Sequence, residues 1–276
     1  MSDPRPIGMF DSGMGGLTVV KELFACIPGE RLVYLGDTAR YPYGGRSDET
    51  IRAFGLEDAR FLLSMDIKML IVACNTVSSV ALDDIQRECN EIPVIGVVAP
   101  GARAAVSRTA SKKIGVIGTL ATIRAQSYQK AIAALDGGIR TYGKACPLFV
   151  PLVEEGLADS DITRLTAQHY LYELVDYGID CLILGCTHYP LLMEAIQSTV
   201  GANVQLLDSA YWTAKEAKDI LLAMEQRNPE KEGGKDKSRF FVTDRTEEFQ
   251  RTASIFLGSP VANLEKMNLE QLTGIL

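Results

Sequence analysis

Short apolar runs alternate with longer segments of mixed polarity along nearly the whole chain. Runs of four or five β-prone residues bounded by polar residues predict buried strands of a parallel sheet, and apolar residues at helical spacing predict the helices between them. We expect strands at residues 6–10, 32–36, 69–73, 94–98, 113–117, 140–143, 181–185, 204–207, 239–243 and 261–267. We expect helices at residues 17–26, 47–65, 77–89, 122–135, 161–177, 191–200, 212–226 and 247–256. The segments 37–46, 146–156 and 227–238 are expected to be loops.

The two halves of this alternating pattern resemble each other. Residues 7–13 match residues 114–119, and residues 94–99 match residues 204–210. Because alternating strands and helices form parallel βαβ units, the pattern predicts an α/β fold of two pseudo-symmetric domains. Each domain is expected to hold a parallel sheet flanked by helices, with the active site in the cleft between them. We expect residues 1–98 plus 208–276 to form a discontinuous first domain and residues 99–207 to form the second.

Two cysteines occupy matching places in the two halves. Cys74 and Cys186 each follow an apolar run, at the carboxyl end of a predicted strand, where open α/β sheets bind their ligands. A helix-like segment follows each cysteine, and the partial positive charge of a helix N-terminus favours a thiolate. We therefore interpret this pair as functional.

Residues beside the two cysteines suit the helix starts expected there. Asn75, Thr76 and Thr187 are candidate helix caps, and Pro190 suits a first helical turn. The remaining four cysteines lie within or beside apolar patterns and are interpreted as buried structural residues: Cys26, Cys89, Cys146 and Cys181.

Composition narrows the possible partners. The chain has 276 residues, a formal net charge of −7 and a pI near 5.0, which argue against nucleic acid or an anionic membrane as a main partner. No apolar run approaches the ~20 residues that span a membrane, and the N-terminus has no signal-like stretch. We therefore expect a cytoplasmic protein. Only His169 and His188 are present and no CxxC occurs, so we expect no metal site and no disulfide scaffold.

A glycine-rich turn follows the first predicted strand, from Asp11 to Gly16. It is either a tight turn that needs positive φ or part of a binding site. Neither GxGxxG nor GxxxxGK[ST] is present, so a nucleotide-phosphate site is poorly supported. The carboxylate of Asp11 would repel a phosphate and suits an ammonium group instead.

Three further positions have both a structural and a functional interpretation. Tyr43 and Gly44 form either a simple turn or a loop whose backbone N–H groups meet a carboxylate. Glu154 and its neighbour Glu155 are either solvated or directed into the cleft. His188 either caps a helix or assists Cys186, whereas His169 is interpreted as structural because it lies mid-helix.

Four separated motifs together resemble those of the bacterial glutamate racemases, within the aspartate/glutamate racemase family. They are Asp11-Ser12-Gly13-x-Gly15-Gly16, Tyr41-Pro42-Tyr43-Gly44, Ala73-Cys74-Asn75-Thr76 and Gly185-Cys186-Thr187-His188-Tyr189-Pro190. The resemblance spans residues 6–256, including Gly118-Thr119-x-x-Thr122 and residues 150–156. It implies a cofactor-independent racemase of two α/β domains, expected to be a homodimer, that interconverts L- and D-glutamate and so feeds peptidoglycan synthesis.

The resemblance also implies roles for individual residues. It makes Cys74 and Cys186 the catalytic pair, with Cys74 removing the α-proton of D-glutamate and Cys186 that of L-glutamate. Asp11, Glu154 and His188 are implied to assist them. The implied glutamate-binding positions are Asp11, Ser12, Tyr43, Gly44, Asn75, Thr76, Thr119, Thr187 and His188.

Three alternatives stay open on the sequence. The chain could be a racemase of aspartate or another acidic amino acid, because pocket depth is not readable. A non-catalytic glutamate-binding protein on the same fold would not need both cysteines. A cysteine hydrolase would form a covalent acyl-enzyme instead of exchanging protons.

Overall fold

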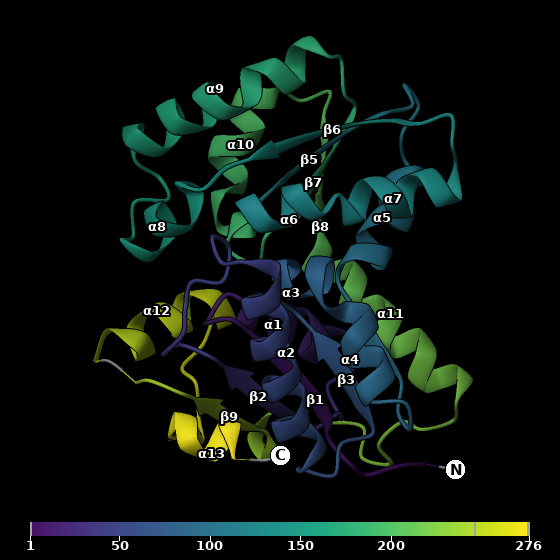
Figure 1. The fold of residues 1–276 in the computed structure, drawn as a ribbon, viewed down its shortest axis with the longest axis vertical. Helices are drawn as coiled ribbons and strands as arrows, with labels where there is room; N and C mark the ends of the chain where they lie inside the picture. Colours follow the sequence, from purple (N-terminus) through teal and green to yellow (C-terminus); the bar gives the residue numbers. More distant parts are fainter. Residues whose placement is uncertain (1, 246, 275–276) are drawn as a thin grey trace.

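The computed structural model describes residues 2–245 and 247–274, which form two parallel sheets covered by helices. Figure 1 shows them as two lobes, with the four-stranded sheet in the upper one. The six-stranded sheet has the order β10-β9-β2-β1-β3-β4, and the four-stranded sheet has the order β6-β5-β7-β8. All recorded strand pairs are parallel, so the predicted α/β fold is confirmed.

The strands mostly occupy the predicted positions. Those of the six-stranded sheet are β1 (Ile7–Asp11), β2 (Leu32–Gly36), β3 (Met69–Val72), β4 (Val94–Gly96), β9 (Arg239–Val242) and β10 (Leu264–Lys266). Those of the four-stranded sheet are β5 (Lys113–Gly118), β6 (Arg140–Ala145), β7 (Cys181–Gly185) and β8 (Gln205–Asp208). Strands β1, β3 and β7 are buried along their whole length, as expected where helices cover both faces of a parallel sheet.

The same strand order in both sheets accounts for the repeated sequence pattern. The series β2-β1-β3-β4 corresponds to β6-β5-β7-β8, so β1 matches β5 and β3 matches β7. In the first sheet Phe10 pairs with Val72, and in the second Gly118 pairs with Gly185. Each cysteine therefore follows a central strand, at the edge of its sheet where the neighbouring central strand also ends.

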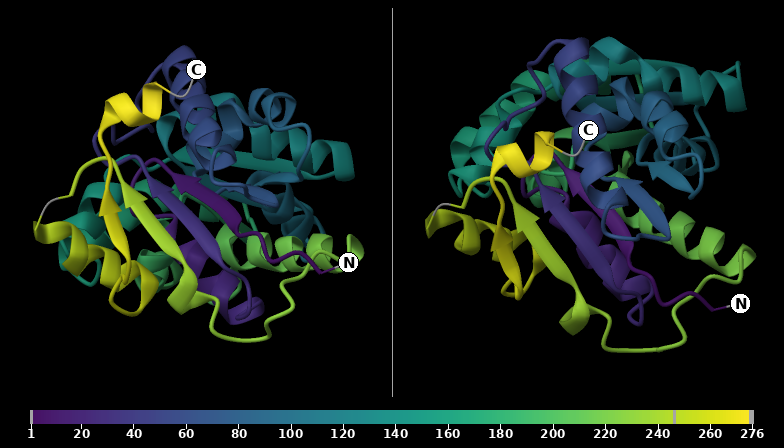
Figure 2. Two further views of the ribbon diagram at one scale, coloured as in Figure 1. Left: turned by 90° about the horizontal axis from the view of Figure 1, so that it is seen from below. Right: turned by 60° about the horizontal axis from the view of Figure 1, so that its bottom comes forward.

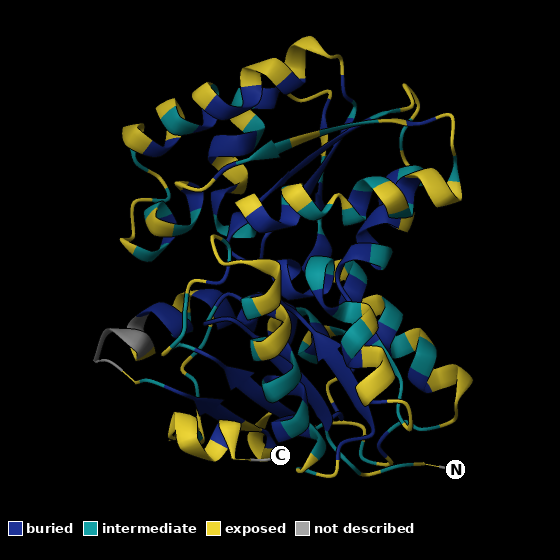
Figure 3. Ribbon diagram, in the orientation of Figure 1, coloured by how far each residue is buried: buried dark blue, intermediate teal, exposed yellow. Residues whose placement is uncertain are grey.

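Helices cover both faces of each sheet, and Figure 3 shows their outer sides exposed and most strands buried, apart from the edge strand β6. Around the first sheet lie α1 (Leu17–Cys26), α2 (Asp48–Leu63), α3 (Asn75–Val80), α4 (Leu82–Glu88), α11 (Ser209–Ala223), α12 (Glu247–Leu257) and α13 (Leu269–Thr273). Around the second lie α5 (Val98–Val106), α6 (Leu120–Ala125), α7 (Ser127–Leu135), α8 (Phe149–Glu154), α9 (Asp161–Asp176) and α10 (Met193–Val200). The 3-10 turns are η1 (Tyr189–Leu192) and η2 (Lys235–Lys237).

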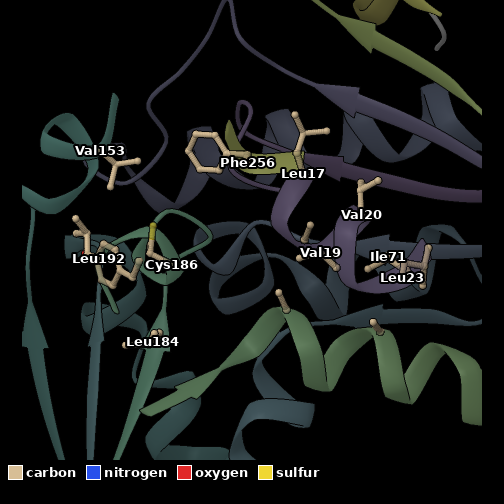
Figure 4. Close-up of a cluster of buried hydrophobic side chains, with 14 of the residues drawn as sticks. Leu17, Val19, Val20, Leu23, Ile71, Val153, Leu184, Cys186, Leu192 and Phe256 are labelled. Carbon is tan, nitrogen blue, oxygen red and sulfur yellow. The ribbon is translucent and has the colours of Figure 1, made fainter. Parts of the chain in front are cut away.

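One buried apolar cluster extends across both lobes. It joins α1 side chains such as Leu17 and Val20 to Cys186 and Leu192 of the second sheet's elements (Figure 4). Phe256 of α12 belongs to the same cluster. Helix α12, which follows the second sheet in the sequence, therefore helps to pack the two lobes together.

The C-terminal part of the chain returns to the first sheet. β9 pairs with β2, and Figure 2 shows β9 and β10 alongside the N-terminal strands. This placement agrees with a discontinuous first domain. The domain limits, residues 1–98 plus 208–276 and residues 99–207, stay a prediction. Residues 1, 246, 275 and 276 lie outside the described residues. Within the described residues, no helix is both long and apolar enough to cross a membrane.

Several predicted boundaries are wrong. The helix expected at residues 77–89 begins at Asn75 and is interrupted at Ala81, and the one expected at 122–135 is interrupted at Gln126, which has φ of 54°. The strand expected at 94–98 ends at Gly96, because α5 begins at Val98. Helix α8 lies inside the expected loop 146–156, and α5 and α13 were not predicted.

The predicted helix caps have mixed outcomes. Ser47 caps α2 by accepting a hydrogen bond from Thr50 N, as its acidic first turn suggests. Asn75, Thr76 and Thr187 do not act as N-caps, because Cys74 and His188 hold the N-cap positions of α3 and η1 without side-chain capping bonds. Pro190 lies in the first turn of η1, as predicted.

Candidate active site

A cavity of about 430 Å³ lies where the central strands of the two sheets end. Every predicted site residue except Asp11 lines it, and both Cys74 and Cys186 are among them. Cys74 follows β3 of the six-stranded sheet, whereas Cys186 follows β7 of the four-stranded sheet. The fold thus brings together two thiols that are far apart in the sequence.

Cys74 is held at the start of α3. Its Sγ lies 3.5 Å from Ser12 Oγ, to which the thiol donates. Burial raises the pKa of Cys74 to about 12, and the charge of Asp11 acts in the same direction. The backbone N–H of Val77 and the hydroxyl of Ser12 oppose this rise.

Cys186 has a similar environment at the end of β7. Burial raises its pKa, the backbone N–H of His188 opposes the rise, and the charges of Asp11, Cys74 and Glu154 add to it. The N–H groups at the helix ends therefore lower both pKa values, in the predicted direction, but burial and nearby negative charge outweigh them and the net shift disfavours the thiolate. The backbone donors, Val77 and Ser12 at Cys74 and His188 at Cys186, do not compensate for the loss of water and for nearby negative charge.

His188 and Glu154 form a polar pair beside Cys186. His188 Nε2 lies 3.1 Å from Glu154 Oε1, and His188 Nδ1 lies 3.5 Å from Thr187 Oγ1. The imidazole stacks on Tyr41 at 6.2 Å between centroids and meets the edge of Phe256 at 5.0 Å. Its ring makes no capping bond, so the geometry favours the functional interpretation of His188.

The neighbouring residues Glu154 and Glu155 lie in different environments. Glu154, at the end of α8, lines the cavity, whereas Glu155 is exposed. Only one residue of this pair can therefore act on a molecule in the cavity.

Asp11 lies at the end of β1, next to the cavity wall. Its Oδ2 accepts a hydrogen bond from Gly13 N at 3.2 Å, and its Oδ1 has no hydrogen-bond partner among the described residues. Burial raises the pKa of Asp11, against the charge of His188 and the backbone N–H groups of Gly16 and Gly13. A buried acceptor without a partner suits a cationic ligand group.

The glycines of the Asp11–Gly16 turn are required by close packing and not by positive φ, contrary to the first interpretation. A Cβ on Gly15 would lie 2.2 Å from Thr187 Oγ1 and 2.6 Å from His188 Nδ1. Gly15 therefore lets the end of β1 approach the residues that follow Cys186.

The loop after β2 forms one wall of the cavity. The Tyr43 side chain is buried and turned to a carboxylate pair, with its hydroxyl bonded to Asp37 and 3.3 Å from Asp58 Oδ2. The Gly44 carbonyl accepts a hydrogen bond from Ala121 N of α6 at 3.0 Å. The tyrosine thus anchors the loop, and the backbone at Gly44 connects it to the second lobe.

Threonines from the two lobes also meet in the cavity. Thr76 Oγ1 and Thr119 Oγ1 are 2.9 Å apart, and Thr119 Oγ1 accepts a bond from Thr122 N at 3.2 Å as the N-cap of α6. Asn75 Oδ1 accepts a hydrogen bond from the Tyr128 hydroxyl at 2.7 Å. The predicted binding residues are therefore linked across the cleft.

Sequence reasoning missed several cavity residues. Tyr41 was recognised only as part of a motif, although it follows a strand end and its hydroxyl is buried. Burial and the charge of Glu154 raise the pKa of Tyr41, so it remains a neutral donor. An apolar wall formed by Leu120, Pro147, Val150 and Pro151 had no signal beyond ordinary hydrophobicity.

Residues 14–217 match the Asp/Glu/Hydantoin racemase family. The chain belongs to this family. The family match begins within the glycine-rich turn and ends within α11, so it includes both cysteines.

Full-length racemases are similar to the chain in sequence and in structure. A glutamate racemase of Geobacter metallireducens is 47% identical, over 96% of this chain and 97% of that protein. The structure of glutamate racemase from Francisella tularensis in complex with D-glutamate has a TM-score of 0.92 and 38% identity, covering 98% of this chain and 99% of that one. The structure from Thermus thermophilus in complex with beta-chloro-D-alanine has a TM-score of 0.87 and 45% identity, covering 98% and 100%. The prediction of an amino acid racemase with two α/β domains is confirmed.

Proposed function

We propose that this racemase interconverts L- and D-glutamate by proton transfer at Cα between two cysteines, without a cofactor. The observation that carries the proposal is that Cys74 and Cys186 line one cavity from the central strands of two different sheets. Two thiols that reach the same carbon from opposite faces can remove the α-proton on one side and return it on the other. The relatives of this chain that are named glutamate racemases support glutamate as the substrate.

In this mechanism one cysteine acts as thiolate and the other as thiol. Cys74 removes the proton of D-glutamate and Cys186 that of L-glutamate. Because both pKa values are raised in this structure, a nearby positive charge must lower one of them during the reaction. The substrate ammonium group supplies such a charge, and Asp11 with its unpartnered Oδ1 would hold it beside the thiols.

The remaining polar groups would stabilise the carbanion that forms. Side-chain donors at Ser12, Asn75, Thr76 and Thr187 line the cavity and suit the two substrate carboxylates. Fixed donors of this kind typically contribute ~3 kcal/mol each to transition-state stabilisation. The His188–Glu154 pair lies next to Cys186 and would assist its proton transfer.

A circular dichroism assay tests the activity directly. Purified protein with L-glutamate and no added cofactor should bring the optical signal to zero as the racemic mixture forms. Parallel assays with L-aspartate test the alternative substrate, and the conversion of aspartate alone would replace glutamate in the proposal. No loss of signal with either amino acid would support the binding-protein alternative, and a mass adduct on a cysteine would support the hydrolase.

Isotope exchange tests the two-base step. In deuterium oxide, the enantiomer that forms should carry deuterium at Cα, because the proton it gains comes from a solvent-exchanged thiol. Cys74→Ala and Cys186→Ala should each abolish racemisation. Full activity in either variant would exclude the two-cysteine mechanism.

We further propose a cytoplasmic homodimer that supplies D-glutamate for peptidoglycan, with domains at residues 1–98 plus 208–276 and at residues 99–207. The resemblance to glutamate racemases supports the biological role and the dimer. Light scattering on the purified chain tests the dimer: a mass of twice 30.1 kDa is expected, and 30.1 kDa would exclude it.

A further inference from the structure

Tyr128 of α7 joins the two halves of the cavity. Its side chain is fully buried, and its hydroxyl donates a hydrogen bond of 2.7 Å to Asn75 Oδ1. Asn75 directly follows Cys74 and lines the cavity, whereas α7 packs on the second sheet's side of the cleft. The bond therefore runs from the lobe of Cys186 to the residue beside Cys74.

The aromatic ring of Tyr128 packs against the strand end that carries Cys186. A Cβ added to Gly185 would lie 3.3 Å from the ring, and one added to Gly101 of α5 would lie 3.1 Å from it. Gly185 directly precedes Cys186, so one side chain touches both cysteine motifs. Burial raises the pKa of Tyr128, with the charges of Asp208 and Cys186 acting the same way, so its hydroxyl keeps the proton that it donates.

The bond from Tyr128 determines which end of the Asn75 amide is available. Oδ1 is occupied, whereas Nδ2 is buried and has no hydrogen-bond partner among the described residues. Buried amide N–H groups almost always find an acceptor. A carboxylate oxygen of an acidic amino acid in the cavity is the acceptor that this donor suits.

We propose that Tyr128 is a positioning residue that fixes the Asn75 amide with its N–H groups towards a substrate carboxylate, and that it does so from the lobe carrying Cys186. The proposal rests on the glutamate racemase function proposed above. It links substrate binding to the relative placement of the two cysteine-bearing strand ends, because the tyrosine packs on one and holds the neighbour of the other.

Tyr128→Phe tests the hydrogen bond while keeping the ring. We expect KM for both enantiomers to rise about tenfold, the usual size for a lost bond that orients a charged ligand, while kcat changes less than threefold. Ser127→Ala is the matched control, because Ser127 Oγ donates to Ser79 O at 2.6 Å from the same helix across the same cleft. Its KM should stay within twofold of wild type. An unchanged KM in Tyr128→Phe, or an equal rise in Ser127→Ala, would overturn the proposal.

A double-mutant cycle asks whether Tyr128 acts through Asn75. In an Asn75→Ala background, adding Tyr128→Phe should change KM by less than twofold, and a further tenfold rise would refute the assignment. Asn75→Asp keeps an acceptor for Tyr128 but loses the amide donor, so it should bind glutamate at least about tenfold more weakly. The Asn75→Asp variant is informative even if Tyr128→Phe folds poorly. Glutamate binding by Asn75→Asp as tight as that of wild type would count against the proposal.

Calorimetric glutamate binding separates this test from the proposed activity. A wild type that binds glutamate but does not racemise it would refute the racemase function and leave the binding ratios of the Tyr128 and Asn75 variants to decide the present proposal. A wild type that racemises glutamate, with the binding of all these variants unchanged, would refute only the role of Tyr128.

Discussion

His188 Nε2 and Glu154 Oε1 lie 3.1 Å apart, and they join the residue two positions after Cys186 to the end of α8. His188 is buried and covered by Tyr41 and Phe256, so this carboxylate is the polar group that orients the Nε2 side of its ring. The placement resembles the general pattern in which a carboxylate sets the tautomer and orientation of a working histidine.

Replacing Glu154 by glutamine should therefore impair catalysis more than binding. Glutamine keeps the shape of the side chain but removes the charge that orients His188, so we expect kcat to fall about tenfold or more with KM within about threefold. Glu155→Gln is the matched control, because Glu155 is adjacent and exposed, and it should leave both constants unchanged. Steady-state kinetics in both directions check this, and a wild-type kcat in Glu154→Gln would show that the pair is not used.

Gly44→Ala should weaken substrate binding through a steric effect. The new Cβ would lie 2.8 Å from Thr119 Cβ and 2.9 Å from its methyl group, so the loop or Thr119 must move. Thr119 is hydrogen-bonded to Thr76 in the cavity, and we expect KM to rise about tenfold, as for about 1.4 kcal/mol of lost binding. Gly45→Ala is the control, because its Cβ would meet nothing within 4 Å. Equal KM values in the two variants would contradict this account of Gly44.

The general arrangement of the chain could be predicted because it depends on local patterns. Buried strands read as apolar runs, and the carboxyl ends of the central strands place Cys74 and Cys186 at the cleft wherever the helix boundaries fall. The boundaries at Ala81 and Gln126 were missed because single residues interrupt otherwise helical patterns there. Helix α5 was not predicted, although Pro100 lies in its first turn, where proline is tolerated.

The parts of the site that could not be predicted depend on contacts between distant residues. Tyr128 contacts Asn75 across 53 positions of the sequence, and the Tyr43 hydroxyl lies 3.3 Å from Asp58 Oδ2 across 15 positions. The raised pKa values of the two cysteines also follow from burial and from Asp11, which are properties of the folded site. A sequence shows which helix begins beside a thiol but not how much water the fold removes from it.

Alkaline pH should destabilise the fold partly through Cys74. Its pKa is raised to about 12 from an ordinary value of 9.0, so its contribution is fully present below pH 9 and is lost as the pH rises towards 12. Linkage gives a loss on the order of 2 kcal/mol by pH 11. Urea unfolding of wild type and Cys74→Ser from pH 8 to 11 checks this, because the variant should lose less stability over that range. Parallel curves for the two proteins would mean that Cys74 ionises as easily in the folded chain as in the unfolded one.

The buried pair of Lys68 and Glu30 should be among the most sensitive positions for stability. Their charged atoms are 2.7 Å apart with side chains 0% and 1% exposed, and Lys68 Nζ also donates to Asp3 O and Gln226 O. Lys68→Met leaves a buried carboxylate without its cation, which should lower the free energy of unfolding by about 3–5 kcal/mol.

An exposed ion pair provides the control for Lys68. Lys237 lies 2.6 Å from Glu230 with side chains 50% and 37% exposed, and Lys237→Met should cost less than about 1 kcal/mol because water screens the pair. Urea unfolding of both variants at pH 7 measures the difference. The backbone N–H of Lys68 donates a hydrogen bond to Pro6 O, just before β1, so Lys68 lies at the amino ends of the strands, opposite the cavity. Folded Lys68→Met should therefore retain its KM for glutamate. An equal loss of unfolding free energy in the two lysine variants would show that the buried pair of Lys68 and Glu30 contributes no more to stability than the exposed pair.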